Sequence, residues 1–430
     1  MNVKSLEKKK VLILGIGREG ADSFVFLRNK FPKKKLVIAD KKKFEEIDLK
    51  TRKLFDKNTE LILGDDYLKN IKSFDVILKS PGISLSSIKK YLGKKTKITS
   101  QTELFFDNCP GMIIGVTGTK GKSTTSSLIY SVLKEAGLKT YLVGNIETPS
   151  LSFLLKAKKE DVFVYELSSH QLQGLEMSPH IAVFLNIYPE HLDYYKDFKE
   201  YFLAKTNIVK YQKKNDYFIF NSKIKEINDL AKKAKSKKIE INSIDFAKFL
   251  KDNQEFLEIT HIDNLIAVLN VLKILNIKEE KIIKAFKKFK RPEHRLEFIG
   301  EKKGIRFYDD SIATIPEATI FALDSLGFDV ETLILGGYDR GIKYDKLGER
   351  LKKSNVKNLV LFNPSGEKIL KTVKGRMRHV FVKNMEEAVK NSFKMTSKGK
   401  ICLLSPASPS FGTFRDYKER GDLFKKYIKA

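Results

Sequence analysis

The residues best suited to chemistry lie in the segment MIIGVTGTKGKST, residues 112–124. Gly118 and Gly121 allow the backbone to turn tightly, so that consecutive N–H groups can point into one concavity at the start of the helix expected next. Such a concavity binds phosphate groups. Lys122 can reach the outer phosphates, and the Ser123 hydroxyl can ligate magnesium. We predict that this segment binds a nucleoside triphosphate.

A second glycine-rich turn lies near the N-terminus, in KVLILGIGREG at residues 10–20. The apolar run predicts a strand, the next residues a helix, and LVIAD a second strand that ends at Asp40, twenty residues after Gly20. This unit has the spacing of a Rossmann fingerprint, with a diphosphate at the helix N-terminus and the acidic residue near a ribose or base. The glycines could instead serve only helix–strand packing, and the pattern alone does not identify the nucleotide.

Further polar residues follow other apolar runs that we interpret as strands. They are Ser80 and Gly82 after FDVILK, Asn145 after LVG, Glu166 after VFVY and His191 after FLNIY. Ligands bind at the carboxyl edge of parallel sheets, so Glu166 and His191 could share a magnesium ion beside the P-loop. Glu166 could also cap a helix, and His191 could be a surface histidine. Lys205 falls within an expected helix, where a lone lysine is normally a solvated charge.

The elements that must position these residues alternate between strands and helices, which predicts an α/β fold. Continuous apolar strands are typical of parallel sheets that are covered on both faces. A chain of 430 residues exceeds one hydrophobic core. We predict three domains, residues 1–108, 109–291 and 292–430, each built on a mostly parallel sheet with Rossmann-like or P-loop-type units. We expect their strand-end loops to face one cleft.

The formal charge of +29 could indicate nucleic-acid binding, since lysine and arginine neutralise phosphates. The lysines are spread along the whole chain without an aromatic-interleaved basic motif, so we expect no nucleic-acid partner. No apolar run approaches the roughly 18 residues that a membrane helix needs. Cys109 and Cys402 lie far apart and form no metal or disulfide framework. We expect a cytoplasmic protein without membrane insertion.

Several segments in combination resemble the Mur ligases of peptidoglycan synthesis. They are GVTGTKGKST, VGNIETP, YELSSHQL, LNIYPEHLDYY, FLAKTNI, PEHRLE and YDDSIAT, in family order over essentially the whole chain. The first is the family's own form of the P-loop, which explains Val116 where the strict pattern has glycine. The resemblance implies an ATP-dependent enzyme that forms an amide bond. GIGREG, SPGIS and the closing LLSPASPSFGTFRDYKERGDLF are most similar to members that add D-glutamate to UDP-N-acetylmuramoyl-L-alanine through an acyl phosphate.

The resemblance also implies roles for residues of all three predicted domains. The UDP-linked substrate would contact Gly17, Arg18, Glu19, Asp40, Lys41, Ser80, Gly82 and Asn145. ATP would be held by Gly118, Thr119, Lys120, Gly121, Lys122, Ser123, Thr124, Asn264, Arg295 and Asp310. The catalytic residues would be Lys122, Glu166, His191 and Lys205. Two magnesium ions (Mg2+) would be bound by Ser123, Glu166, His191 and a carbamylated Lys205. D-glutamate would contact Thr314, Arg340, Ser410 and Tyr417 in a third domain that closes over ATP. We expect a monomer.

Some positions depart from the family pattern. Ile312 replaces a lysine, so one phosphate or substrate contact is missing. Arg340 stands where a lysine is common, which keeps the charge but offers a planar, bidentate group. Tyr417 replaces a phenylalanine and adds a hydroxyl group. Residues 261–264 read His-Ile-Asp-Asn where the family has His-Asn before the second asparagine.

Other functions remain open on the sequence. A folylpolyglutamate synthase or a sister Mur ligase would share the P-loop, Glu166 and His191, but the GIGREG unit and the C-terminal segment argue against both. A Rossmann oxidoreductase would bind nicotinamide at residues 15–20 and leave the P-loop unexplained. A basic P-loop protein acting on nucleic acid would show salt-dependent DNA binding. A non-catalytic regulator would bind ATP without turnover.

Overall fold

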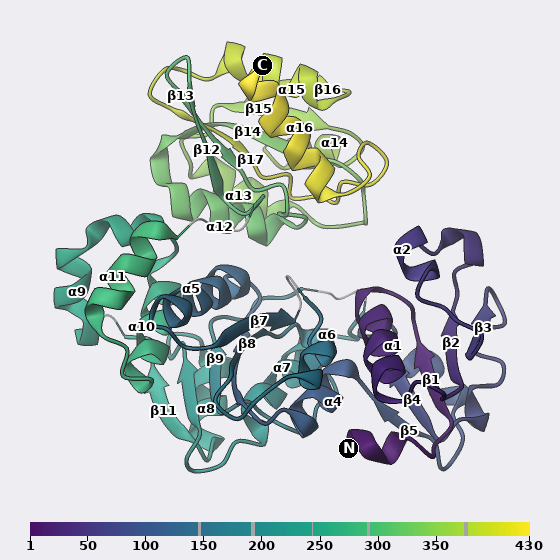
Figure 1. Ribbon diagram of the computed structural model, residues 1–430. Helices are drawn as coiled ribbons and strands as arrows, with labels where there is room; N and C mark the ends of the chain where they lie inside the picture. The colour runs from purple at the N-terminus through teal and green to yellow at the C-terminus, as the bar shows by residue number, and fades with distance from the viewer. Residues whose placement is uncertain (145–147, 191–193, 243, 290–292, 374–376) are drawn as a thin grey trace. The chain divides into compact units, whose positions relative to one another are not determined.

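The computed structural model describes residues 1–144, 148–190, 194–242, 244–289, 293–373 and 377–430. Its strands form three sheets, and the chain divides into two compact units, Met1–Phe289 and Lys290–Ala430 (Figure 1). The first unit holds two of the sheets. The predicted α/β class with mostly parallel sheets is therefore confirmed. The predicted boundaries near residues 108 and 291 stay predictions.

The first sheet is parallel throughout, with the strand order β3-β2-β1-β4-β5. Its strands are β1 (Val11–Leu14), β2 (Leu36–Asp40), β3 (Thr59–Leu63), β4 (Val76–Lys79) and β5 (Lys97–Thr99). Its helices are α1 (Arg18–Lys30), α2 (Leu49–Arg52), α3 (Leu85–Ile88) and α4 (Gln101–Asn108). Strands β1 and β4 are neighbours, so the turns after them, at residues 15–17 and 80–83, lie at the same edge.

The central sheet is also parallel, with the order β11-β10-β9-β6-β8-β7. Its strands are β6 (Met112–Thr117), β7 (Thr140–Gly144), β8 (Val162–Glu166), β9 (Ile181–Phe184), β10 (Tyr217–Phe220) and β11 (Lys237–Glu240). The helices are α5 (Lys122–Glu135), α6 (Ser169–Leu172), α7 (Phe198–Lys210), α8 (Lys225–Lys233), α9 (Ala247–Asp252), α10 (Ile262–Ile274) and α11 (Glu279–Lys288). Strand β6 contributes to two hydrophobic cores, because successive side chains of a strand point to opposite faces of the sheet. Ile113 packs in one core and Ile114 packs in the other.

The first and central sheets share a hydrophobic core. Phe105 of α4 packs edge-on against Phe163 and Tyr165 of β8, with ring centroids 5.1 and 5.7 Å apart. Asp22 of α1 accepts hydrogen bonds from Gln101 Nε2 (2.8 Å) and from the backbone N–H of Leu151 (3.0 Å). These contacts join helices α1 and α4 of the first sheet to the central part of the chain.

The second unit contains a mixed sheet with the order β12-β13-β17-β14-β15-β16. Its strands are β12 (Glu297–Lys302), β13 (Ile305–Asp309), β14 (Val330–Gly336), β15 (Asn358–Phe362), β16 (Arg378–Val382) and β17 (Ile401–Leu404). Its helices are α12 (Pro316–Leu326), α13 (Asp345–Lys352), α14 (Ser365–Thr372), α15 (Met385–Met395) and α16 (Tyr417–Lys429). Only β12 runs antiparallel to its neighbour among the strands described here, forming a hairpin with β13 (Figure 1).

Over the described ranges, the structure contains no helix with both the length and the apolar character required to cross a bilayer.

Candidate active site

The predicted P-loop connects β6 to α5. Gly121 is the N-cap of α5 and has a φ of 82°, a conformation that side chains other than glycine rarely adopt. Lys122 folds back over the loop, and its Nζ donates to the carbonyl oxygens of Gly118 (2.9 Å) and Thr119 (3.0 Å). Lys120 forms an ion pair with Glu190 at 3.0 Å. The loop therefore carries two lysine ammonium groups next to the N-terminus of a helix, which suits a polyphosphate.

Two oxygen-bearing side chains lie at this loop. Ser123 is fully buried, and its Oγ has no hydrogen-bond partner among the residues that the structure describes. Glu166, also buried, ends β8, and it is the register partner of Val116 on the adjacent β6. A buried hydroxyl without a partner and a nearby carboxylate fit a hard divalent cation such as magnesium. The third predicted ligand, His191, lies outside the described residues, as does Asn145.

Lys205 is buried beside the P-loop rather than solvated. It is 1% exposed, and its Nζ donates to Thr117 Oγ1 (3.3 Å) and to the carbonyl oxygen of Gly118 (3.1 Å). Burial, reinforced by the nearby Lys122 cation, lowers the pKa of Lys205 well below its ordinary value. The expectation from spacing alone, that a lysine on this helix is a solvated charge, is wrong, because α7 packs against the sheet at this point.

A cavity of about 300 Å³ joins the P-loop to the first sheet. Lys122, Glu190 and Lys205 line it from the central sheet, and Glu19 and Gly82 line it from the first. Residues more than 180 positions apart in the sequence therefore meet in one cavity. Glu190 was not singled out from the sequence, although it directly precedes the predicted ligand His191 in the sequence.

The glycines of the first turn have different roles. A Cβ at Gly20 would lie 2.0 Å from the carbonyl oxygen of Gly15, so Gly20 permits close helix–strand packing. A Cβ at Gly17 would meet no atom within 4 Å, so the backbone there is open to a ligand. Asp40 fixes this turn, since its Oδ2 accepts from Ile16 N at 2.7 Å and its Oδ1 accepts from Lys42 N at 2.9 Å. Gly20 therefore serves helix–strand packing, as one of the two interpretations of this turn predicts. Gly17 offers the open backbone that a diphosphate needs.

The remaining predicted residues of the first sheet surround this turn. Ser80 donates from its Oγ to the carbonyl oxygen of Gly15 at 2.9 Å and so ties the β4 turn to the β1 turn. Arg18, Lys41 and Gly82 are exposed at the same carboxyl edge. Asn264, in contrast, belongs to the P-loop: it is buried in the first turn of α10 and abuts Gly121.

The second unit gathers a separate group of predicted residues at the carboxyl ends of the adjacent strands β13, β17 and β14. Thr314, Arg340 and Ser410 lie on the loops that follow these strands, and Tyr417 begins α16. The β14 and β17 loops touch, because Tyr338 N donates to Pro409 O at 2.9 Å. The Arg340 guanidinium lies 5.7 Å from the centre of the Phe411 ring. One cation and several hydroxyl groups at a common edge suit a small anionic ligand.

Asp310 and Arg420 form the buried support of this group. Asp310 accepts from Ser405 Oγ (2.8 Å) and from Leu296 N (3.2 Å), and burial raises the pKa of its carboxyl to about 7. Arg420 is fully buried and donates to Ser311 O at 2.7 Å and to Ser408 O at 3.1 Å. Arg420 was not singled out from the sequence, because a helical arginine is normally exposed. Predicted residue Arg295 lies on the segment before β12 and is partly exposed.

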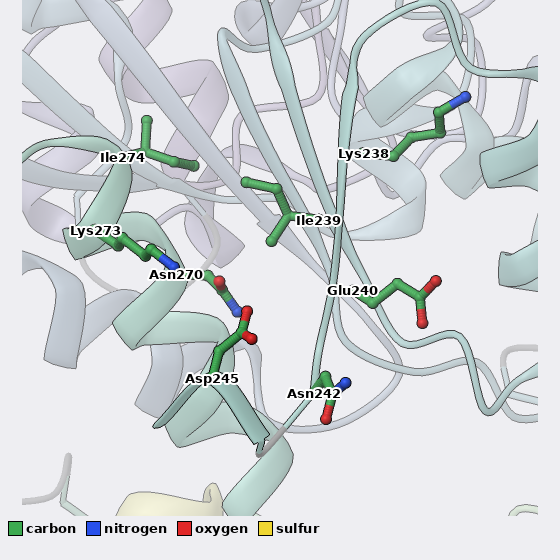
Figure 2. A pocket seen from close by; sticks show the side chains of 8 residues that line it. All are labelled: Lys238, Ile239, Glu240, Asn242, Asp245, Asn270, Lys273 and Ile274. Carbon is green, nitrogen blue, oxygen red and sulfur yellow. The ribbon is translucent and has the colours of Figure 1, made fainter. Parts of the chain in front are cut away.

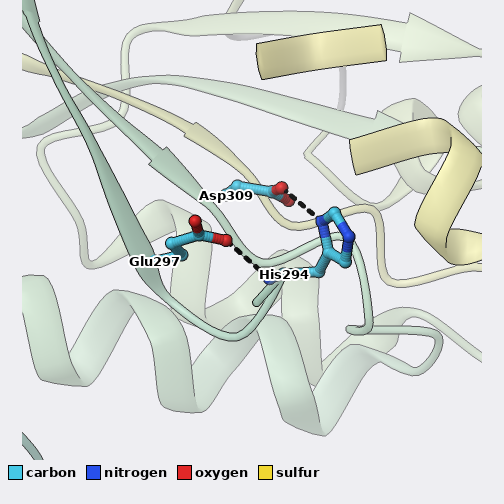
Figure 3. Close-up of side chains that lie close together, drawn as sticks. All are labelled: His294, Glu297 and Asp309. Carbon is cyan, nitrogen blue, oxygen red and sulfur yellow. Dashed lines mark hydrogen bonds and ion pairs between the residues drawn. The ribbon is translucent and has the colours of Figure 1, made fainter. Parts of the chain in front are cut away.

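A cluster of possible metal ligands, His294, Glu297 and Asp309, lies nearby in the same unit (Figure 3). His294 Nδ1 and Asp309 Oδ2 bond directly to each other at 2.7 Å. Gly421 covers this pair so closely that a Cβ there would lie 2.1 Å from His294 Nδ1. Glu297 accepts from His294 N and pairs with Lys425. These groups are used in holding α16 against the sheet, so the cluster does not suit a metal ion.

The structure also has a larger hollow, of about 560 Å³, at the edge strand β11 and helix α10 (Figure 2). Asp245, Asn270 and Lys273 converge there, and Lys238 and Glu240 also line it. Opposite charges are mixed, and none of the predicted site residues lies in it. The smaller cavity at the P-loop is therefore the better candidate for the active site.

Comparison with known proteins identifies the family. Residues 116–285 match the family described as Mur ligase middle domain, and residues 294–408 match the Mur ligase, glutamate ligase domain. A protein from Acetivibrio thermocellus named UDP-N-acetylmuramoylalanine–D-glutamate ligase is 35% identical over 99% of this chain and 97% of its own. A protein of the same name from Clostridium kluyveri is 35% identical over 98% of this chain and 96% of its own.

Solved structures show the same fold at low identity. The MurF ligase from Thermotoga maritima in complex with ADP has a TM-score of 0.59 at 17% identity, covering 100% of this chain and 97% of that one. The UDP-N-acetylmuramate–alanine ligase MurC from Thermotoga maritima has a TM-score of 0.59 at 16% identity, covering 98% and 99%. With full-length relatives above 30% identity and two matching family domains, the chain belongs to the Mur ligase family.

Proposed function

We propose that this chain joins D-glutamate to UDP-N-acetylmuramoyl-L-alanine with conversion of ATP to ADP and phosphate, in cytoplasmic peptidoglycan precursor synthesis. The observation that carries the proposal is the cavity in which Lys122 and Lys205 of the P-loop region meet Glu19 and Gly82 of the first sheet. The names of the full-length relatives support the same substrates. A monomer without a nucleic-acid partner remains our prediction.

The proposal divides the work among the three predicted domains. Residues 1–108 bind the UDP-linked substrate, with its diphosphate at the open backbone of Gly17. Residues 109–291 bind ATP at the P-loop, a function supported by the ADP held by the related Thermotoga ligase. Residues 292–430 bind D-glutamate, whose two carboxylates suit the Arg340 cation and the hydroxyl groups around it.

The chemistry begins from a carboxylate, which is a poor electrophile. Transfer of the γ-phosphoryl group of ATP to the alanyl carboxylate gives an acyl phosphate, and Lys122 neutralises charge as that group moves. The amine of D-glutamate then attacks the acyl carbon, and phosphate leaves from the tetrahedral intermediate. Holding the reacting groups in line is chiefly a matter of proximity and orientation.

Magnesium and a modified lysine complete the proposed site. Ser123 and Glu166, together with His191, would hold magnesium, which supplies positive charge to the phosphate oxygens when bound. Lys205 is held by Thr117 and Gly118 and is favoured as a neutral amine by its burial. A neutral amine is the form that reacts with carbon dioxide, so the environment of Lys205 suits carbamylation.

The experiment measures ATP-dependent phosphate release with UDP-N-acetylmuramoyl-L-alanine against a panel of amino acids, with the product mass determined. We expect release with D-glutamate and the mass of its adduct. The Lys122→Ala variant should lose release, whereas Lys134→Ala, which removes an exposed lysine from the last turn of the same helix, should retain it. Phosphate release with a different amino acid would show that the chain uses the amino acid of another ligase of the superfamily. Normal turnover by Lys122→Ala would refute the proposed use of the P-loop.

A further inference from the structure

Glu19 is an acidic residue at a place where the proposed function puts phosphate. It lies in the first turn of α1, one residue beyond the N-terminal Arg18, and lines the cavity that also contains Lys122 and Lys205. Its Oε1 accepts a hydrogen bond from Gln171 Nε2 at 2.7 Å. Its Oε2 is buried and has no hydrogen-bond partner within the described part of the chain. A carboxylate so placed repels an incoming diphosphate and leaves one oxygen unsatisfied.

Among the residues that the structure describes, no cation forms an ion pair with Glu19. The cation with the largest effect on this carboxyl group is Lys79, at the end of β4, but its Nζ donates to the carbonyl oxygens of Ser80 (3.1 Å) and Ile83 (2.7 Å). The other titratable or charged groups that face Glu19 or share its cavity are Arg18 and Asp22 of α1, Tyr165 of β8, and Lys122, His170, Glu190, Tyr201 and Lys205. The Lys79 ammonium therefore acts on Glu19 through space, while its hydrogen bonds stabilise the turn.

We propose that Glu19 takes up a proton when the nucleotide substrate binds, and that the protonated carboxyl group donates a hydrogen bond to a phosphate oxygen. The proton comes from the solvent and forms an O–H bond on Oε2, while Oε1 keeps its bond from Gln171. Protonation removes the repulsion between the two anions and gives the buried oxygen a partner. The inference deepens the proposed function, because it rests on a diphosphate at the N-terminus of α1.

The protonation costs little free energy near neutral pH. Burial raises the pKa of Glu19 to about 7, while the Gln171 hydrogen bond and the Lys79 charge act in the opposite direction. If only the protonated form binds, the affinity follows the protonated fraction of Glu19. That fraction falls about tenfold between about pH 6 and about pH 8 for a pKa near 7.

The test is calorimetric titration of the full chain with UDP-N-acetylmuramoyl-L-alanine, whose diphosphate is a diester that does not titrate in this range. Titrations in buffers of different ionisation enthalpy count the protons taken up. We expect an uptake of about half a proton or more at about pH 7, and an affinity that falls about tenfold from about pH 6 to about pH 8. Zero uptake by the wild-type chain would overturn the inference without any variant.

The Glu19→Gln variant supplies a second measurement, because the amide resembles the protonated carboxyl group in shape. Its affinity should no longer show the tenfold fall over this range, and the proton uptake assigned to Glu19 should be lost. Glu160→Gln, which changes an exposed carboxylate that does not line the cavity, should keep the wild-type pH dependence. A Glu19→Gln variant that binds with the wild-type pH dependence, or that loses kcat while keeping that dependence, would overturn the inference in favour of a catalytic base.

The proposed function and the inference about Glu19 can be refuted separately. Ligase turnover in the same preparation tests the proposed function, and it does not depend on how Glu19 titrates. Turnover without proton uptake refutes only the inference about Glu19. Absence of both turnover and binding of the UDP-linked substrate refutes the proposed function and, with it, the inference.

Discussion

Replacing Gly121 with alanine tests the P-loop most directly. Gly121 has a φ of 82°, and an L-residue pays about 1–2 kcal/mol to adopt the left-handed conformation. An added Cβ would also lie 2.6 Å from both Nδ2 and Oδ1 of Asn264, closer than real Cβ contacts. Asn264 is buried, and its Nδ2 donates to Thr260 Oγ1 at 3.1 Å, so it cannot move aside without losing that bond. We therefore expect the loop itself to shift.

The size of the effect follows from the backbone strain. If the empty loop relaxes and ATP binding must restore its shape, a strain of about 1–2 kcal/mol weakens ATP binding by about five- to thirtyfold. The collision with Asn264 adds to this, so about fivefold is the smallest loss expected. The loss should appear in the KM for ATP, and the KM for the UDP-linked substrate should change less.

The matched control is Gly137→Ala. Gly137 has a φ of 87°, and a Cβ there would meet no atom within 4 Å. This variant has the same kind of backbone strain without a collision and outside the phosphate loop. Steady-state phosphate release should show the raised KM for ATP only in Gly121→Ala, whereas thermal unfolding should show destabilisation in both variants. A wild-type KM for ATP in Gly121→Ala would refute the geometry that we ascribe to the loop.

Two further predictions concern buried ionisable groups. Lys205→Ala should abolish ligase turnover. With isotope-labelled bicarbonate, the wild-type chain should give a carbamate carbon signal by NMR, and the variant should lack it. An unchanged signal in the variant would place the carbamate on another residue. For Asp310, burial raises the pKa to about 7, above the unfolded value of about 3.9, so the folded state retains a proton that the unfolded chain releases. Stability should therefore fall as the pH rises from about 4 to about 7, and Asp310→Asn should reduce this slope in chemical unfolding experiments; equal slopes for the two proteins would contradict the assignment.

Much of the local structure was predictable from the sequence because it depends on neighbouring residues. Buried apolar runs that end in glycine identified β1 and β6, and the spacing after Gly118 placed Lys122 and Ser123 at the start of a helix. The combination of motifs also identified the family, which the comparisons confirmed. The antiparallel strand β12 was missed, since Glu297–Lys302 has an irregular pattern of burial and owes its conformation to pairing with β13.

Only the tertiary structure decided what surrounds the reactive groups. Nothing near Lys205 in the sequence distinguishes it from a surface lysine; its burial arises because α7 packs behind the P-loop and leaves Nζ against Thr117 and Gly118. Likewise, Glu19 lies in a cavity with Lys122 because the first and central sheets share a core. The backbone conformation of a turn depends mainly on residues within a few positions of it. The sequence by itself therefore determined the phosphate-binding turn. Burial, charge and protonation depend on distant segments, and these became known only when the packing of the sheets was known.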